Sequence, residues 1–378
     1  MTAAILTVGT DVARGDASDA CGEWLAARMS GLGFDVFERT VVPDDAEAVR
    51  RAVQRFVDAC AVVVTVGGLL DGSVRSALGL GHAHDAAATA LGSDGSFTLR
   101  AGRAQVVCLG ADLAAVEHVF DGGALKHLIA RARTPDRVAK LRIVGLAARD
   151  LGPRLRAVVP ASVSVALHEA HPEATVTLRV PGAVPGAADL LTRTVDEVRA
   201  RLGSAVFGEG DESFAAAVGK ALRSRGRTLA VAESCTGGLI GSMLTAVPGS
   251  SEYLLLDAVT YSNVAKTRVL RVPSEVLLAH GAVSVECVRA MAAGARRLTD
   301  ADLAVAVSGI AGPTGGTSEK PVGLVCFALE GEGVSLEQVI RFDGDRAAVQ
   351  RQAAYHALSL VRDACAGPVT TTLPSVCG

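Results

Sequence analysis

The stretch TLAVAESCTGGLIGSML, residues 228–244, decides the fold of the C-terminal part of the sequence. Its first residues are β-rich and predict a strand, ESCTGG predicts a polar turn, and the apolar remainder predicts a helix. Paired glycines at such a turn leave backbone N–H groups free at the start of a helix, where they can hold a phosphate or a developing oxyanion. The turn would present Ser234 as an exposed hydroxyl. The alternative is that a serine or threonine only caps the helix, while the glycines allow close packing.

The same alternation of strand and helix extends through most of the chain. Residues 4–130 alternate apolar strands with amphipathic helices, which implies parallel β-α-β units. Residues 140–206 differ, because two strands followed by a helix at 187–202 indicate a small α+β module. From residue 207 the α/β pattern returns and ends in a helix near 346–364. We therefore expect two doubly wound three-layer α/β domains, 1–138 and 207–366, joined by a small α+β module at 139–206.

Composition excludes several classes of function. The net charge of −3 gives no attraction to nucleic acid or to anionic membranes, and an aromatic content of 3% disfavours base stacking. The longest apolar run, near residues 59–66, is far shorter than the ~20 residues that span a bilayer. The first residues predict a β-strand and no signal peptide. Eight scattered cysteines without a CxxC pair predict buried free thiols in a reducing cytoplasm rather than disulfides or a metal site.

The hexapeptide YSNVAK, residues 261–266, is unusual for this chain. It contains the only asparagine of the sequence, Asn263, and one of five lysines, Lys266. Asn263 alone would be interpreted as a helix cap. Lys266 suggests more, because a desolvated lysine can lose its proton and act as a base, whereas arginine stays charged. Chance placement of one lysine is the alternative.

A third segment, AVAVSGIAGPTGGTSEKPVG at residues 304–323, ends a predicted strand in a glycine-rich loop. Glycine lets a backbone approach a ligand closely, and a loop directly after an apolar strand is a usual place for a site. A flexible surface loop is the alternative. The candidate residues of this loop are Ser308, Gly309, Gly312 and Gly315.

One mechanism joins the three segments. A serine nucleophile needs an adjacent base, and a Ser–Lys pair is a known alternative to Ser–His. The histidines offer no rival, since His280 and His356 stand outside these segments. Ser234 as nucleophile, Lys266 as base and the amides of Gly237 and Gly238 as oxyanion donors would make an amidohydrolase.

The blocks ESCTGG, VPGSS, YSNVAK, HGAVS and SGIAGPTGGTSEKPVG occur in this order and resemble the C-terminal domain of the CinA (competence/damage-inducible) family. The match covers about residues 207–364. The stand-alone form of that domain is a nicotinamide-nucleotide amidase. The resemblance therefore implies hydrolysis of nicotinamide mononucleotide to nicotinic acid mononucleotide and ammonia, a step of pyridine nucleotide salvage in the cytoplasm. It implies a homodimer, and neither a metal nor an organic cofactor.

Roles for individual residues follow from the same resemblance. Ser234 and Lys266 would be catalytic, and Tyr261 would assist proton transfer or orientation. Arg346 is the candidate for the nucleotide phosphate, with Arg351 as the second choice. The remaining substrate-binding candidates are Glu233, Thr236, Gly237, Gly238, Asn263, Ser308, Gly309, Gly312 and Gly315.

The first segment resembles the molybdopterin-binding-like N-terminal domain of the same family, with departures. After Gly68 the chain reads LLDGSVRSALG, without the Gly-Pro-Thr and the acidic pair of the family pattern, and VVCLGADLAAVEHVF replaces a Pro-Gly loop. We expect this domain to keep its fold but to lack the metal-dependent ADP-ribose pyrophosphatase activity linked to the family. The acidic remnants are Asp11, Asp16 and Asp71, and the alternative that they are only solvated loop residues is favoured. Two alternatives stay open: a decayed nucleotide-binding scaffold and a bifunctional enzyme.

Overall fold

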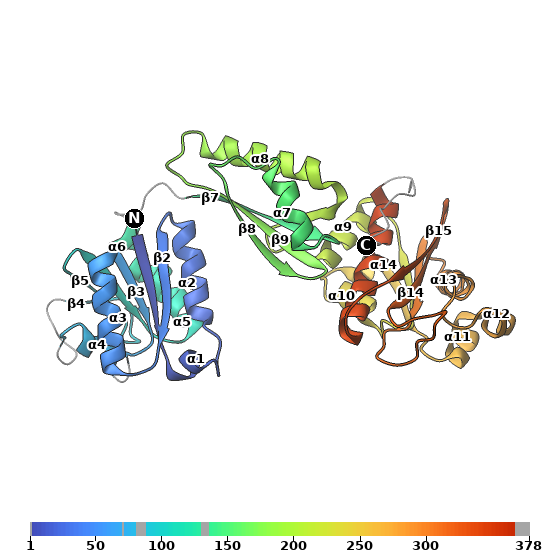
Figure 1. The fold of residues 1–378 in the computed structure, drawn as a ribbon, viewed down its shortest axis with the longest axis horizontal. Coiled ribbons are helices and arrows are strands. Elements are labelled where there is room, and N and C mark those ends of the chain that lie inside the picture. The colour runs from blue at the N-terminus through green and yellow to red at the C-terminus, as the bar shows by residue number, and fades with distance from the viewer. Residues whose placement is uncertain (1, 70–71, 81–87, 130–135, 367–378) are drawn as a thin grey trace. The chain divides into compact units, whose positions relative to one another are not determined.

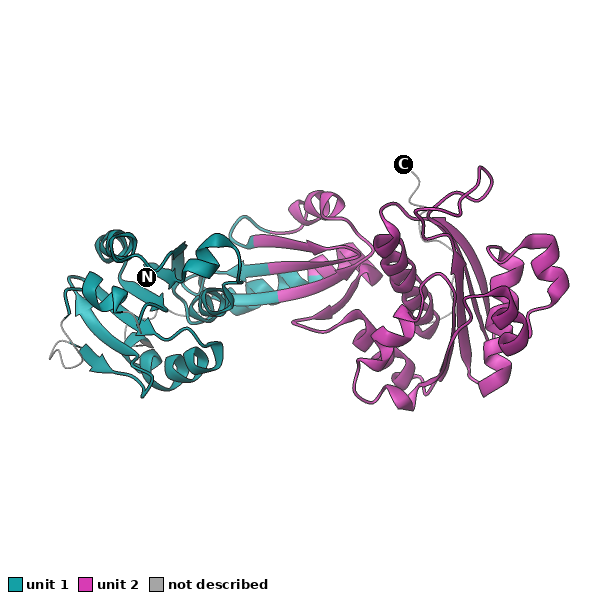
Figure 2. Cartoon of the chain, turned by 90° about the horizontal axis from the view of Figure 1, so that it is seen from below, with its two compact units in different colours: residues 1–139, 160–164, 178–196 teal, residues 140–159, 165–177, 197–378 magenta. Residues whose placement is uncertain are grey.

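The computed structural model describes residues 2–69, 72–80, 88–129 and 136–366. The chain divides into two compact units, coloured separately in Figure 2. Unit 1 contains residues 1–139, 160–164 and 178–196. Unit 2 contains residues 140–159, 165–177 and 197–378.

The N-terminal part of unit 1 is built on a six-stranded sheet with the strand order β2-β1-β3-β6-β5-β4. Strands β1, β2, β3 and β6 are parallel, whereas β4 and β5 pair antiparallel with their neighbours. The strands are β1 (Thr2–Val8), β2 (Asp35–Val42), β3 (Val62–Val66), β4 (Ala88–Ala90), β5 (Phe97–Ala101) and β6 (Ala104–Leu109). The helices are α1 (Thr10–Arg14), α2 (Ala20–Gly31), α3 (Ala46–Ala59), α4 (Ser73–Ala77), α5 (Leu113–Val119), η1 (Phe120–Ala124) and α6 (Leu125–Ile129).

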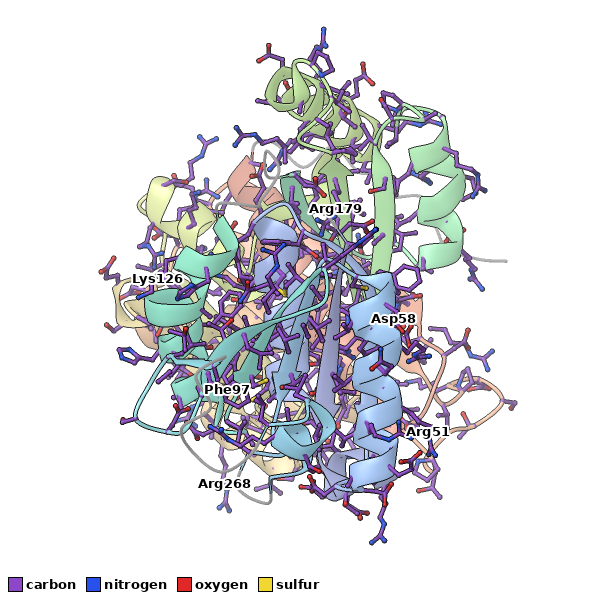
Figure 3. The ribbon with its side chains drawn as sticks, turned by 90° about the vertical axis from the view of Figure 1, so that its left-hand side faces the viewer. Arg51, Asp58, Phe97, Lys126, Arg179 and Arg268 are labelled. Atoms are coloured by element: carbon purple, nitrogen blue, oxygen red, sulfur yellow. The ribbon has the colours of Figure 1, made fainter. Side chains whose placement is uncertain are left out.

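Alternation along the strands divides the core of this domain into two halves. Ile5 packs with α2 and α5 on one face of the sheet, and Leu6 packs with α3 on the other. In Figure 3, Arg51 and Asp58 project outward from α3 into solvent, whereas Phe97 is buried against the sheet. Helices on both faces of a mostly parallel sheet make a three-layer α/β domain, as predicted.

A smaller sheet has the strand order β10-β7-β9-β8. It consists of β7 (Arg137–Val144), β8 (Ser164–Ala170), β9 (Glu173–Val180) and β10 (Val206–Glu209), with α7 (Ala148–Arg156), α8 (Ala187–Leu202) and the short η2 (Gly203–Ala205). The α+β character and the helix α8 agree with the prediction. Helix α7 was not predicted, because Pro153 interrupts its apolar pattern; the proline lies within the helix nevertheless.

The C-terminal part of unit 2 has a five-stranded sheet of order β12-β11-β13-β14-β15 (Figure 1). Strands β11, β12 and β13 are parallel, and β14 and β15 are antiparallel, so the sheet is mixed. The strands are β11 (Leu229–Glu233), β12 (Leu254–Val259), β13 (Leu303–Gly309), β14 (Leu324–Gly331) and β15 (Val334–Arg341). The helices are α9 (Phe214–Ser224), α10 (Leu239–Thr245), η3 (Ser250–Glu252), α11 (Asn263–Leu270), α12 (Ser274–His280), α13 (Val285–Thr299) and α14 (Arg346–Ala366).

This sheet is also covered on both faces. Val231 packs into a core formed with α9, α10 and α14, while Ala230 packs into a core formed with α11 and α13. Both α/β domains are therefore three-layered, which confirms the predicted fold class. Strand β12 has an apolar sequence, yet it lies at the sheet edge, where Leu255 and Val259 are 44% and 47% exposed.

Two expectations about the chain as a whole can be compared with the structure. Within the described ranges, every helix is too short or too polar to cross a membrane. The seven cysteines in these ranges are buried free thiols, as predicted, and Cys377 lies outside them.

Candidate active site

The side chains of the adjacent residues Glu233 and Ser234 point to opposite faces of the C-terminal sheet. Successive side chains of a strand point to opposite faces, so Glu233 follows Val231 toward α10, and Ser234 follows Ala232 toward α11. Strand β11 ends at Glu233, and Ser234 begins the turn. Ser234 is only 7% exposed, so the expectation of an exposed hydroxyl is wrong.

The turn after Ser234 depends on two glycines in the left-handed region, Gly237 with φ 66° and Gly238 with φ 96°. L side chains rarely adopt such angles, which explains the glycine pair. The Gly238 amide donates to Glu233 Oε2 at 2.9 Å, and the Gly237 amide donates to the Ser234 carbonyl at 3.2 Å. Both amides are therefore already engaged, which contradicts the oxyanion role predicted for them.

Two other amides of the turn have no acceptor among the described residues that would occupy them. The N–H groups of Cys235 and Thr236 donate to no other residue in the described part of the chain, and Cys235 lines the cavity beside Ser234. The Thr236 hydroxyl is buried and has no hydrogen-bond partner among the described residues.

Helix α11 carries Lys266. The helix begins at Asn263, but its cap is Ser262 rather than Asn263, because Ser262 Oγ accepts from the Ala265 amide at 3.1 Å. Lys266 lies one turn into the helix and is 1% exposed. Its Nζ is 2.8 Å from Ser234 Oγ, 2.8 Å from the Thr260 carbonyl oxygen and 3.4 Å from the Tyr261 carbonyl oxygen.

These three neighbours fit a neutral amine. An uncharged NH₂ group has two N–H donors, for the two carbonyl oxygens, and one lone pair, for the Ser234 hydroxyl proton. No carboxylate among the described residues forms an ion pair with Lys266, and burial lowers its pKa. The arrangement is that of a lysine ready to accept a proton from serine.

The two groups open onto a cavity of about 180 Å³. Arg346, at the start of α14, spans one side: its Nη1 donates to the Gly312 carbonyl at 2.9 Å and its Nη2 to the Tyr261 hydroxyl at 3.1 Å. Ser308 donates to the Ala282 carbonyl at 2.7 Å. The lining residues are Ser234, Cys235, Tyr261, Lys266, Ala282, Val283, Ser308, Gly309, Ala311 and Arg346.

A second, larger cavity of about 580 Å³ adjoins the first, and Ala311 and Arg346 line both. Its other walls come from the glycine-rich loop and from the turn before α14: Pro313, Val322, Gly344, Asp345 and Ala347. Arg346 is therefore the cation shared by both spaces, whereas Arg351 lines neither.

The structure thus brings six predicted residues to one cavity: Ser234, Lys266, Tyr261, Ser308, Gly309 and Arg346. Seven others line neither cavity: Glu233, Thr236, Gly237, Gly238, Asn263, Gly312 and Gly315. Asn263 is exposed on the surface. Ala282 and Val283 also line this cavity and were not predicted, although they belong to the block HGAVS, which was the signal that could have found them.

Comparison with known proteins identifies the family of this chain. The CinA C-terminal domain matches residues 211–365, and the "Probable molybdopterin binding domain" matches residues 4–70. A CinA-like protein of Anaeromyxobacter sp. (strain K) is 35% identical over 406 residues, which cover 96% of this chain and 99% of that protein. The chain belongs to the CinA family. A CinA-like protein of Citrifermentans bemidjiense is 34% identical and covers 96% of this chain and 97% of its own length.

Solved CinA structures match part of the chain. A CinA superfamily protein from Klebsiella pneumoniae is 40% identical and covers 40% of this chain and 96% of its own, with a TM-score of 0.40. A competence/damage inducible protein from Agrobacterium tumefaciens is also 40% identical and covers 41% and 94%, with the same TM-score.

The acidic residues named above for the N-terminal domain are Asp11, Asp16 and Asp71. Asp11 and Asp16 are exposed, and Asp71 lies outside the described residues. No group of three histidine, cysteine or acidic side chains in the described ranges is arranged to hold a metal ion. Gly67, after β3, packs so closely that a Cβ there would be 2.2 Å from the Val8 carbonyl oxygen, so this glycine has a packing role.

Proposed function

We propose that this CinA protein hydrolyses the carboxamide of nicotinamide mononucleotide to nicotinic acid mononucleotide and ammonia. The observation that carries the proposal is the buried Lys266 amine, placed 2.8 Å from Ser234 Oγ with two carbonyl oxygens for its N–H groups. A buried lysine without a counter-ion is disposed to be neutral, and a neutral lysine can act as a base. Membership of the CinA family is consistent with this proposal, but it does not by itself specify the reaction.

The reaction begins when Ser234 Oγ attacks the carboxamide carbon while its proton passes to Lys266 Nζ. The tetrahedral intermediate carries its negative charge on the former carbonyl oxygen, and we assign the amides of Cys235 and Thr236 to that oxygen. Lys266 then gives the proton to the departing nitrogen, so ammonia leaves and an ester with Ser234 remains. Water attacks the ester, gives a proton to Lys266, and the acid leaves as Ser234 regains its hydrogen.

The sizes of the two cavities support a nucleotide substrate. Pockets for whole drug-sized ligands measure roughly 300–1,000 Å³. The first cavity, at about 180 Å³, suits only the reacting ring, whereas the adjoining space of about 580 Å³ can receive the ribose and phosphate. Arg346 borders both and is our candidate for the phosphate, because a guanidinium binds phosphate with two parallel hydrogen bonds.

We also propose that the protein is a cytoplasmic homodimer. Apolar side chains are exposed on the edge strand β12 and on α11, namely Leu255, Val259, Val264 and Val269. The buried free thiols agree with a reducing compartment. Sedimentation of the purified chain tests the dimer, and a single species at monomer mass contradicts it.

The decisive experiment measures ammonia release from nicotinamide mononucleotide by the wild type and by Ser234→Ala. We expect turnover by the wild type and a loss of at least about 10³-fold in the variant. Undiminished turnover by Ser234→Ala rejects Ser234 as the nucleophile. Binding without turnover by the wild type supports a decayed nucleotide-binding scaffold instead.

A further inference from the structure

Behind the nucleophile, on the face of the sheet opposite Lys266, lies a fully buried carboxylate. Glu233 is 0% exposed and accepts two backbone N–H groups, from Gly238 to Oε2 and from Gly241 to Oε1, both at 2.9 Å. Glu233 directly precedes Ser234. Of the two amides that donate to Glu233, that of Gly238 lies at the end of the turn and that of Gly241 lies within α10. One side chain therefore ties the end of β11 to the far end of the turn that carries Ser234.

Asp257 of the neighbouring strand β12 lies beside this carboxylate. Asp257 pairs with Val231 in the sheet, so its side chain shares the face of Glu233. A Cβ on Gly241 would be 2.0 Å from Asp257 Oδ2, so α10 has a glycine where the carboxyl group packs against it. Asp257 Oδ1 is buried without a hydrogen-bond partner among the described residues.

The pair has no counter-ion. None of the ion pairs between described residues includes Glu233 or Asp257. A buried carboxylate and a half-buried one beside it, without a cation, cannot both ionise without a large electrostatic cost, so one of them holds a proton. Because Glu233 already accepts two amide hydrogens, the proton belongs on Asp257. Burial and the neighbouring Glu233 carboxylate raise the pKa of Asp257 to about 7.

We propose that Glu233 and Asp257 form a proton-sharing carboxyl pair that positions the Ser234 turn. In this pair Glu233 is the anion that binds the Gly238 and Gly241 amides, and Asp257 is the neutral acid that keeps it in place. Neither residue lines the cavity, so both act through the geometry of Ser234 and of the adjacent amides. The activity readout of this proposal rests on the proposed amidase function.

Several other titratable groups lie on the elements packed around the pair. Helix α10 and strand β13 have no titratable side chains. Burial raises the pKa of Cys235 to about 12, lowers the pKa of His356, on α14, to about 4, and lowers the pKa of Lys266 across the sheet. The other ionisable groups on these elements are Glu252 of η3, Arg346, Arg351, Tyr355, Arg362, Asp363 and Cys365 of α14, and Lys220 and Arg223 of α9.

The first test compares kcat and KM for nicotinamide mononucleotide in the full chain from about pH 6 to about pH 9. As pH rises through the pKa of Asp257, the pair loses its proton and two anions repel beneath the turn, so wild-type kcat should decline. Asp257→Asn has a neutral donor at every pH, so its kcat should lack this alkaline decline. Glu233→Gln replaces one acceptor oxygen with an NH₂ group, and kcat should fall about 10²-fold with KM almost unchanged. Glu252→Gln, an exposed acid nearby, is the matched control.

The second test needs no substrate and separates this proposal from the proposed function. The amide NMR resonances of Gly238 and Gly241 should shift with a midpoint near the Asp257 pKa in the wild type, and should not do so in Asp257→Asn. If the wild type lacks turnover but these resonances titrate, the amidase function is wrong and the carboxyl pair stands. Wild-type resonances that do not titrate near neutrality overturn the pair, whether or not the variants fold. An unchanged alkaline decline of kcat in Asp257→Asn also overturns it.

Discussion

Lys266 Nζ lies 2.8 Å from Ser234 Oγ, although 32 residues separate them in the chain. The contact arises because β11 and β12 are parallel neighbours, so the segments that follow them, the Ser234 turn and α11, leave the same edge of the sheet. Ser234 points toward α11 by strand alternation, and Lys266 lies one turn into that helix. The sheet topology thus places the Lys266 amine beside the Ser234 hydroxyl, and no ion pair between described residues holds it there.

The first prediction is that Lys266→Arg abolishes activity. Arginine keeps the positive charge but cannot lose its proton, so it cannot accept the hydrogen of Ser234. We expect kcat for nicotinamide mononucleotide to fall at least about 10³-fold, measured by ammonia release. Lys220→Arg, an exposed lysine on α9, is the matched control and should be unchanged. Activity of Lys266→Arg within about threefold of wild type would show that Lys266 is not the base.

The second prediction concerns the pH dependence of stability. Burial lowers the pKa of Lys266 below the ordinary value of 10.5, so the folded protein binds this proton more weakly than the unfolded chain. The cost of the buried ammonium is complete below the lowered pKa. It is relieved as pH rises from that pKa toward 10.5, and the stability contributed by Lys266 rises with it.

Lys266→Met removes this titration while filling a similar volume. The free energy of unfolding of the wild type minus that of Lys266→Met should therefore increase from about pH 7 to about pH 10. Urea unfolding followed by circular dichroism at each pH measures the difference. Lys220→Met supplies the control, since an exposed lysine should give a difference independent of pH. A flat difference for Lys266→Met argues that the lysine has an ordinary pKa.

The third prediction separates the two arginines considered for the phosphate. Arg346 donates to both Gly312 and Tyr261 and borders both cavities, whereas Arg351 borders neither. Arg346→Lys removes the planar guanidinium that can form two parallel hydrogen bonds to a phosphate. We therefore expect the KM for nicotinamide mononucleotide to rise about tenfold or more. Arg351→Lys should leave KM unchanged. Steady-state kinetics on both variants decide the point, and the reverse pattern would assign the phosphate to Arg351.

The sequence predicted the Ser234–Lys266 pair better than the contacts around it. Ser234 could be found because it stands in a glycine-containing turn between a strand and a helix, and Lys266 because the chain has only five lysines. The use of the turn amides could not be predicted, because strand alternation alone does not say that Glu233 would accept the Gly238 hydrogen. Helix α7 could not be predicted because proline usually ends a helix, and the apolar sequence LLLDAV of β12 does not reveal that this strand lies at an edge.

The fourth prediction concerns the packing of the helix that carries Lys266. Gly294 of α13 packs against the end of α11, where an added Cβ would be 2.0 Å from the Leu270 carbonyl oxygen. Backbone cannot yield as a side chain can, so Gly294→Ala should lower the free energy of unfolding by about 1–3 kcal/mol and reduce kcat as α11 moves. Gly152→Ala, in α7, meets only the flexible end of Arg156 at 3.4 Å and should be neutral or slightly stabilising. Equal stability of the two variants in urea would contradict the close packing.

The fifth prediction is that the N-terminal domain does not cleave ADP-ribose. Its loops lack the acidic pair of the family pattern, and Asp11 and Asp16 are exposed without a third acidic, histidine or cysteine ligand among the described residues. We expect no AMP from ADP-ribose with magnesium, manganese or cobalt, measured by chromatography. A chelator should leave deamidation unchanged, because Ser234 and Lys266 supply nucleophile and base without a metal. Metal-dependent AMP release that survives in Ser234→Ala would instead establish a second active site in the N-terminal domain.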